Sequence, residues 1–141
     1  MDFIQTIITT IIGFLLGFLS TILYDIWKNC THNKLKRESL KSFLKAEQNS
    51  NLDLLKSLNT CWKIEGLFLS SNALIECLKN PHLFEQKLFL NLIELNSNIT
   101  FYNTRIPNGD VRNISLLGIY DEYNKKFQDL KFKLQEIVSI I

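Results

Sequence analysis

The sequence predicts an all-α protein with one N-terminal transmembrane helix followed by a small helical bundle. Two observations lead to this prediction. The stretch from Phe3 to Tyr24 contains no Asp, Glu, Lys, Arg or His. After it, apolar residues recur at intervals of three and four, the spacing of a helix with one buried face, and no segment has the convincing alternation of a strand. The expected parts are a transmembrane helix at 1–27, a basic juxtamembrane segment at 28–38 and a helical domain at 39–141.

The N-terminal stretch has the length of a membrane span. At about 1.5 Å per helical residue it is roughly 33 Å long, close to the hydrocarbon thickness of a bilayer. A cleavable secretory signal is not favoured, because no Lys or Arg precedes Lys28 and no small-x-small cleavage site follows. Tyr24 and Trp27 suit the membrane interface. The remaining alternative is a helix buried in a soluble core.

The flanking charges predict the orientation. Between Lys28 and Lys45 there are six basic residues and one acidic residue, Glu38. Basic residues resist translocation, so we expect the inner membrane of a cell, the N-terminus outside and the helical domain in the cytoplasm. The cluster could also attract anionic lipid headgroups. Charge after residue 45 is nearly balanced, which argues against binding of a nucleic acid duplex.

Three helical segments are expected between the transmembrane helix and residue 107. The first runs from about 35 to 62, and a shorter one covers 64–79, with Ser70, Ser71 and Asn72 as stop and cap residues. Asn80-Pro81 predicts the start of the next helix. Its apolar stripe is Phe84, Leu88, Leu92, Leu95, Ile99 and Tyr102. This helix should end before Pro107, where turn residues follow.

The last segment has an unbroken heptad pattern. The apolar positions are Leu116, Tyr120, Tyr123, Phe127, Leu130, Leu134, Ile137 and Ile141. Such a seam is typical of a helix that packs inside a bundle, and self-association is the alternative. Leu117, Phe132 and Val138 lie off the seam and would suit a helix buried on more than one side.

Small and hydroxyl-bearing residues recur along the N-terminal helix. Thr9, Gly13, Gly17 and Thr21 are spaced by four, and Gly13 to Gly17 forms a small-xxx-small motif. Small residues let two membrane helices approach closely, so these four residues predict self-association. The alternative is chance, because Gly and Thr are common in membrane helices. A pore lined by this row would be closed at rest, since the row is only weakly polar.

No catalytic constellation is present, and we expect neither an enzyme nor a bound metal or cofactor. The segment from Tyr102 to Asn113 concentrates groups that could hold an anion and a base edge. The candidate ligand-binding residues are Tyr102, Asn103, Arg105, Asn108 and Arg112. A solvated turn between helices is the alternative interpretation.

This order of parts resembles small single-pass membrane effectors of bacterial antiphage defence, including the effector of type III CRISPR systems that binds cyclic tetra-adenylate. The resemblance covers the whole chain in architecture. It implies a homo-oligomer, a tetramer in the fourfold case, that binds a cyclic nucleotide and perturbs the lipid bilayer or opens a pore. Two other classes remain: a membrane-tethered protein-interaction module without ligand gating, and a constitutive membrane toxin.

Overall fold

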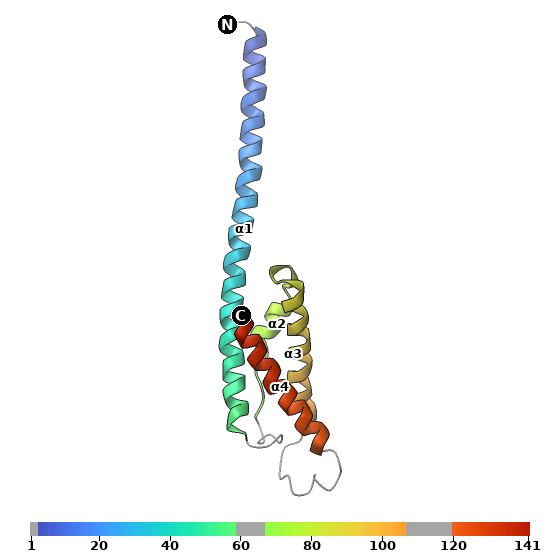
Figure 1. The fold of residues 1–141 in the computed structure, drawn as a ribbon. Helices are drawn as coiled ribbons and strands as arrows, with labels where there is room; N and C mark the ends of the chain where they lie inside the picture. The colour runs from blue at the N-terminus through green and yellow to red at the C-terminus, as the bar shows by residue number, and fades with distance from the viewer. Residues whose placement is uncertain (1–2, 59–66, 107–119) are drawn as a thin grey trace. The chain divides into compact units, whose positions relative to one another are not determined.

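The computed structural model describes residues 3–58, 67–106 and 120–141, and in these ranges the chain is helical without strands (Figure 1). The all-α prediction is therefore confirmed. The elements are α1 (Phe3–Ser57), α2 (Asn72–Leu78), a 3-10 turn η1 (Pro81–Leu83), α3 (Gln86–Arg105) and α4 (Tyr120–Ile140). The chain divides into an N-terminal unit, Met1–Lys36, and a helical unit, Arg37–Ile141. The first part of α1 belongs to the N-terminal unit and its last part to the helical unit.

Helix α1 is one uninterrupted helix of 55 residues. It contains no proline, and its last glycine is Gly17, so no helix breaker separates the predicted membrane segment from the predicted helix at 35–62. The helix ends at Ser57, five residues earlier than predicted. There the Ser57 hydroxyl donates to the Leu54 carbonyl (2.7 Å) and the Leu58 N–H donates to the Leu55 carbonyl (3.3 Å). These i to i−3 bonds tighten the last turn.

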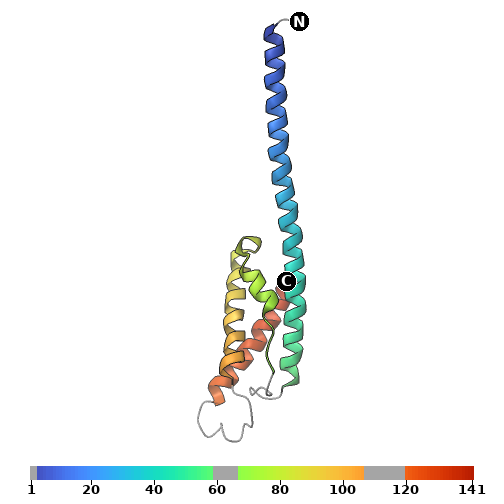
Figure 2. The ribbon, with the colours of Figure 1, turned by 180° about the vertical axis from the view of Figure 1, so that it is seen from behind.

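The core of the helical unit is formed by the stripes that the sequence predicts. Helix α1 contributes Leu40, Leu44, Leu52 and Leu55, and α3 contributes Leu92, Leu95, Ile99 and Tyr102. Helix α4 contributes Phe127, Leu130, Leu134 and Ile137. Figure 2 shows α3 (yellow to orange) beside α4 (red) and α2 (green), and α3 contacts both. Burial of these side chains is the main stabilising contribution to the unit.

The heptad seam of α4 faces this core, which confirms packing within the bundle. Tyr120, Tyr123 and Ile141 extend the seam as partly buried residues, while Leu116 lies outside the described residues. The prediction for residues off the seam is wrong at Phe132, which is 69% exposed. Helix α4 is therefore buried on one side at this position. Val138 is half-buried, and Leu117 lies outside the described residues.

Asn80 and Pro81 do not begin the long helix, in contrast to the prediction. They begin the single 3-10 turn η1, and the chain is then extended at Phe84 (φ −121°, ψ 150°) before α3 starts at Gln86. The Asn80 side chain makes no cap bond and donates instead to the Glu76 carbonyl, at 2.9 Å. Helix α3 ends at Arg105, before Pro107, as predicted.

Two asparagine side chains hold the extended segment 67–70 against the helices. The carboxamide of Asn51 accepts from the Ser70 N–H (2.9 Å) and donates to the Ser70 carbonyl (2.7 Å). The carboxamide of Asn103 does the same for Leu69, at 2.9 Å and 3.0 Å. Each carboxamide thus satisfies one backbone N–H and one backbone carbonyl of the segment through part-buried hydrogen bonds.

Helix α2 receives its N-terminal cap from a distant residue. Ser71, at the N-cap position, makes no side-chain cap bond. The Glu47 carboxylate of α1 instead accepts from the N–H groups of Ala73 (2.9 Å) and Leu74 (3.2 Å), and from the Ser70 hydroxyl (2.8 Å). A carboxylate at this end of a helix also interacts favourably with the helix dipole. Glu47 and Asn51, one turn apart on α1, therefore connect α1 to segment 70–74.

We expect Asn51→Ala to lower the free energy of unfolding of the helical unit by about 1–2 kcal/mol, because it removes the part-buried hydrogen bonds that the Asn51 carboxamide makes with the Ser70 backbone. Asn49→Ala is the matched control, since Asn49 is exposed on the same helix and should change stability by less than about 0.5 kcal/mol. Denaturant unfolding of the full chain in neutral detergent measures both. Equal effects of the two substitutions would show that the Asn51 bonds contribute little.

Candidate functional site

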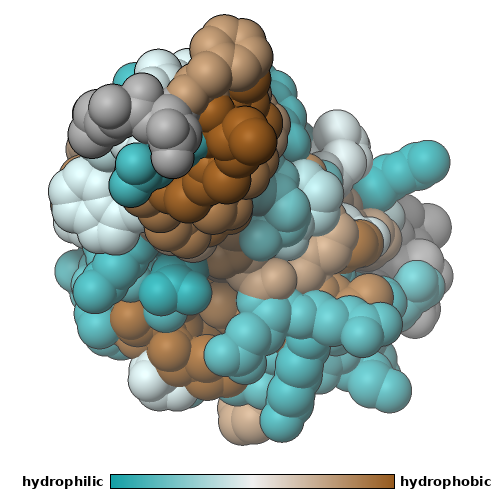
Figure 3. Space-filling model, turned by 90° about the horizontal axis from the view of Figure 1, so that it is seen from above, coloured by the Kyte–Doolittle hydropathy of each residue, from teal (hydrophilic) through white to brown (hydrophobic). Residues whose placement is uncertain are grey.

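The apolar part of α1 is fully exposed in the structure. Phe3 is 80% exposed, Leu16 60% and Leu23 65%, and none of the most apolar window of the helix is buried. Figure 3, viewed from the N-terminal end, shows mostly brown, hydrophobic side chains on this segment. An apolar surface of this length is not stable in water. The segment has the length and composition of a membrane span, and among the described residues α1 is the one helix that meets both criteria.

Four hydroxyl groups of this segment donate hydrogen bonds within the helix itself. Thr9 donates to the Gln5 carbonyl (2.8 Å) and Thr21 to the Gly17 carbonyl (3.0 Å). Thr10 and Ser20 make the same bond to the carbonyl four residues before. Such bonds satisfy the hydroxyl donors, which suits a hydrocarbon environment. The predicted packing residues Thr9 and Thr21 therefore need no partner helix for their own hydrogen bonds.

Gly13 and Gly17 leave open space on the helix surface. A Cβ atom added at either position would meet no other atom within 4 Å. Larger side chains there would therefore not disturb the chain by itself. Any close approach at these glycines would have to come from another molecule, and self-association stays a prediction.

The predicted ligand-binding residues are not brought together as a described site. Tyr102 is fully buried, its ring stacked on Phe127 at 6.4 Å between centroids, and burial raises the pKa of its hydroxyl to about 12. Asn103 uses its carboxamide on the Leu69 backbone. Arg105 is exposed in the last turn of α3, and Asn108 and Arg112 lie outside the described residues. Tyr102 and Asn103 thus have structural roles in the helical unit.

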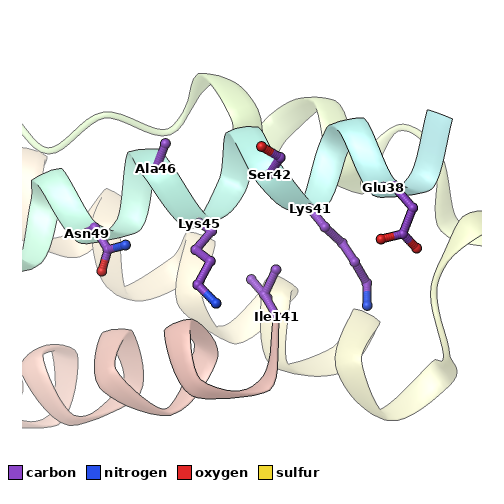
Figure 4. Close-up of a pocket in the computed structure, with 7 residues that line it drawn as sticks. All are labelled: Glu38, Lys41, Ser42, Lys45, Ala46, Asn49 and Ile141. Atoms are coloured by element: carbon purple, nitrogen blue, oxygen red, sulfur yellow. The ribbon is translucent and has the colours of Figure 1, made fainter. Parts of the chain in front are cut away.

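A basic groove lies in the helical unit between α1 and the end of α4. Its volume is about 460 Å³, and Lys41 and Lys45 extend into it from α1 on the side of Ile141 (Figure 4). The other lining residues are Glu38, Ser42, Ala46 and Asn49. The sequence places these lysines in the basic cluster that predicts orientation and could attract lipid headgroups, but it does not predict a groove. Lys41 and Lys45 are four residues apart, which places both on one face of a helix. This spacing indicates that the two lysines contribute to the same surface.

A second, smaller cavity adjoins Lys41. Its volume is about 120 Å³, and it has an apolar wall formed by Leu83, Phe84 and Leu88. The remaining lining residues are Arg37, Lys41, Glu85 and Ile140. Lys41 therefore lines both cavities, and the wall of the smaller one also contains the aromatic ring of Phe84. Such a combination can accept a ligand that has both an anionic and an apolar part.

The described residues do not offer a reactive thiol or a metal cluster in this unit. Cys77 is fully buried, and burial raises the pKa of its thiol to about 11, with further contributions from Glu47 and Glu76. A protonated, inaccessible thiol is a poor nucleophile. No group of three His, Cys, Asp or Glu side chains suited to a metal occurs in the part of the chain that the structure describes.

Comparison with known protein families, with curated proteins and with solved structures found no match. Conclusions about function therefore depend on the exposed apolar segment of α1 and on the geometry of the helical unit.

We expect Leu16→Arg to make the full-length protein extractable from membranes, because an arginine replacing leucine at the centre of a span costs about 3 kcal/mol. Leu35→Arg is the matched control: Leu35 is similarly exposed (67%) but lies after Trp27. The measurement is the fraction that remains in the membrane pellet after alkaline carbonate washing. A wild-type protein that is itself soluble after this wash would contradict the assignment of a membrane span.

Proposed function

We propose that this protein is an oligomeric, single-pass membrane effector. In this proposal the apolar part of α1 spans the inner membrane, with the N-terminus outside and the helical unit in the cytoplasm. The helical unit binds a small anionic signal, and binding perturbs the membrane or opens it. Antiphage defence is the setting that the resemblance in architecture implies, with a cyclic oligoadenylate as the signal.

The observation that carries the proposal is the double role of α1. A simple anchor needs only an apolar helix and a flexible linker, but here the same helix continues into the core of the helical unit. Its buried residues there are Leu40, Leu44, Gln48, Asn51, Leu52 and Leu55. A change in packing of the helical unit must therefore act on α1 itself. This favours a membrane segment that responds to the domain over one that only localises it.

A signal can drive such a response only if it binds one arrangement of the helical unit more tightly than another. The polar contacts of Glu47 and Asn51 give α1 specific partners in segment 70–74. Ligand binding that shifts either contact would change how α1 is held. The membrane helices would associate through Gly13 and Gly17, where the structure leaves room for a partner.

A membrane-tethered interaction module is the second candidate. Two large aromatic side chains of the helical unit are exposed, Phe43 at 65% and Phe132 at 69%. Exposed aromatic residues are frequent anchors of protein interfaces. Such a module would leave the membrane intact, so leakage separates the two candidates.

Interrupting α1 should abolish the membrane effect. We expect insertion of seven Gly and Ser residues after Cys30 to prevent dye leakage from vesicles that contain the purified protein and receive cyclic tetra-adenylate. Seven alanines at the same place should preserve leakage, because they continue the helix and rotate it by only about 20°. The measurement is release of an encapsulated fluorescent dye.

Three outcomes would contradict this proposal. If vesicles with the glycine–serine variant and vesicles with the alanine variant release dye equally, helix continuity does not couple the helical unit to the membrane. If wild-type protein leaks without any added ligand, the protein is a constitutive toxin. If wild-type protein leaks neither with cyclic tetra-adenylate nor with other phosphate-bearing ligands, the interaction module is the better conclusion.

Gly13→Ile combined with Gly17→Ile should reduce self-association in detergent while leaving the helical unit unchanged. Both positions are open in the single chain, so the larger side chains can act only on a contact with another molecule. Ile12→Leu combined with Leu16→Ile is the control, because it conserves volume. The measurement is the mass of the protein–detergent particle, and an unchanged mass for the double isoleucine variant would exclude packing through this motif.

A further inference from the structure

We infer that the basic groove lined by Lys41 and Lys45 binds a phosphate-bearing anion. The two ammonium groups are the ligands of the phosphate, and the apolar wall at Phe84 and Leu88 contacts the remainder of the molecule. The inference gives the signal-binding step of the proposed function a location. It depends on that function only for the consequence of binding at the membrane.

The charge of the two lysines is not compensated by any other group in the part of the chain that the structure describes. Neither Lys41 nor Lys45 has a hydrogen-bond or ion-pair partner in residues 3–58, 67–106 and 120–141. Three other lysines of the helical unit do have acidic partners: Lys56 pairs with Asp53, Lys79 with Glu76, and Lys133 with both Glu94 and Glu136. Lys41 is also only partly exposed. Two adjacent cations that face one cavity attract an anion more strongly than either does alone.

The remaining polar groups of the groove fit this assignment. Figure 4 shows Lys41, Lys45 and the Asn49 carboxamide extending from α1 toward the side of α4 and Ile141, so Asn49 can donate to the same ligand. The Glu38 carboxylate also lines the groove and opposes an anion. Its charge is offset by Arg37, whose Nε lies 3.5 Å from the Glu38 Oε1. Among the side chains that line the groove, two ammonium groups therefore accompany a single carboxylate, that of Glu38.

The smaller cavity restricts the class of ligand. Lys41 lines this cavity together with Arg37 and the Phe84 ring, so a phosphate at Lys41 lies next to an aromatic and aliphatic wall. The carboxylate of Glu85 is the one acidic group in its lining. A ligand that fills both cavities carries a phosphate and an apolar or aromatic part. Nucleotides and phospholipid headgroups share this chemistry.

The experiment measures binding by the full-length protein in a neutral detergent and in nanodiscs. Wild type, Lys41→Gln/Lys45→Gln and Lys87→Gln/Lys125→Gln are compared. Lys87 and Lys125 are exposed, unpaired within the described residues and outside both cavities, so the third protein loses the same charge elsewhere. One arm titrates pyrophosphate and ATP. The other compares nanodiscs of phosphatidylglycerol with nanodiscs of phosphatidylcholine, using protection of Lys41 and Lys45 from amine-reactive labelling.

Two results support the inference. A soluble phosphate ligand binds wild type, its Kd rises roughly tenfold or more in Lys41→Gln/Lys45→Gln, and the control changes little. Alternatively, no soluble ligand binds, but phosphatidylglycerol protects Lys41 and Lys45 in wild type and not Lys87 and Lys125, which identifies a lipid headgroup as the source. Binding should weaken with added salt in either case.

Two results overturn it. If both double variants lose the same binding affinity, the effect is one of net charge in general. If wild type shows neither ligand binding nor protection from labelling, the groove holds only solvent. If Lys41→Gln disturbs folding, the single variant Lys45→Gln is measured instead, because Lys45 is exposed. Because this assay needs no leakage, a groove that binds without releasing dye would refute the proposed function and leave the inference intact.

Discussion

Helix α1 has two different kinds of surface along its length, and the rest of the structure depends on this difference. Its first part presents apolar side chains on all sides, as a helix does in lipid. Its last part has one apolar face, and that face forms part of a core together with α3 and α4. Helix α1 runs without interruption from the first kind of surface to the second, among the residues that the structure describes.

Polar side chains, more than apolar ones, give the helical unit its particular arrangement. Glu47 caps α2, while Asn51 and Asn103 hold segment 67–70 by its backbone. Gln48 is fully buried beside them, donates to the Glu47 carboxylate and accepts from the Asn51 amide. Apolar burial is not directional, so it would tolerate many placements of a short extended segment. Buried hydrogen bonds do not, because each unpaired group is costly.

The structure does not group the predicted ligand-binding residues, and its basic groove lies elsewhere in the helical unit. Tyr102 and Asn103 have the chemistry to bind a ligand, but both are used inside the unit, one in the core and one on the Leu69 backbone. In the sequence, Lys41 and Lys45 belong to the basic cluster that predicts orientation and could attract lipid headgroups. In the structure they line a groove, and neither has a partner among the described residues. Unpaired cations facing a cavity indicate a ligand more directly than a polar segment does. The function we propose therefore places the signal beside α1.

The sequence by itself determined the helical class, the apolar segment, and the buried faces of α3 and α4, because these follow from composition and from helical periodicity along one segment. It also predicted that α3 ends before Pro107. Only the tertiary structure decided that α1 is continuous, that Asn80-Pro81 starts a short turn, and that Glu47 caps α2. The physical reason is that capping and buried hydrogen bonds join residues far apart in the chain. Local propensity cannot indicate which distant side chain will satisfy a given backbone group.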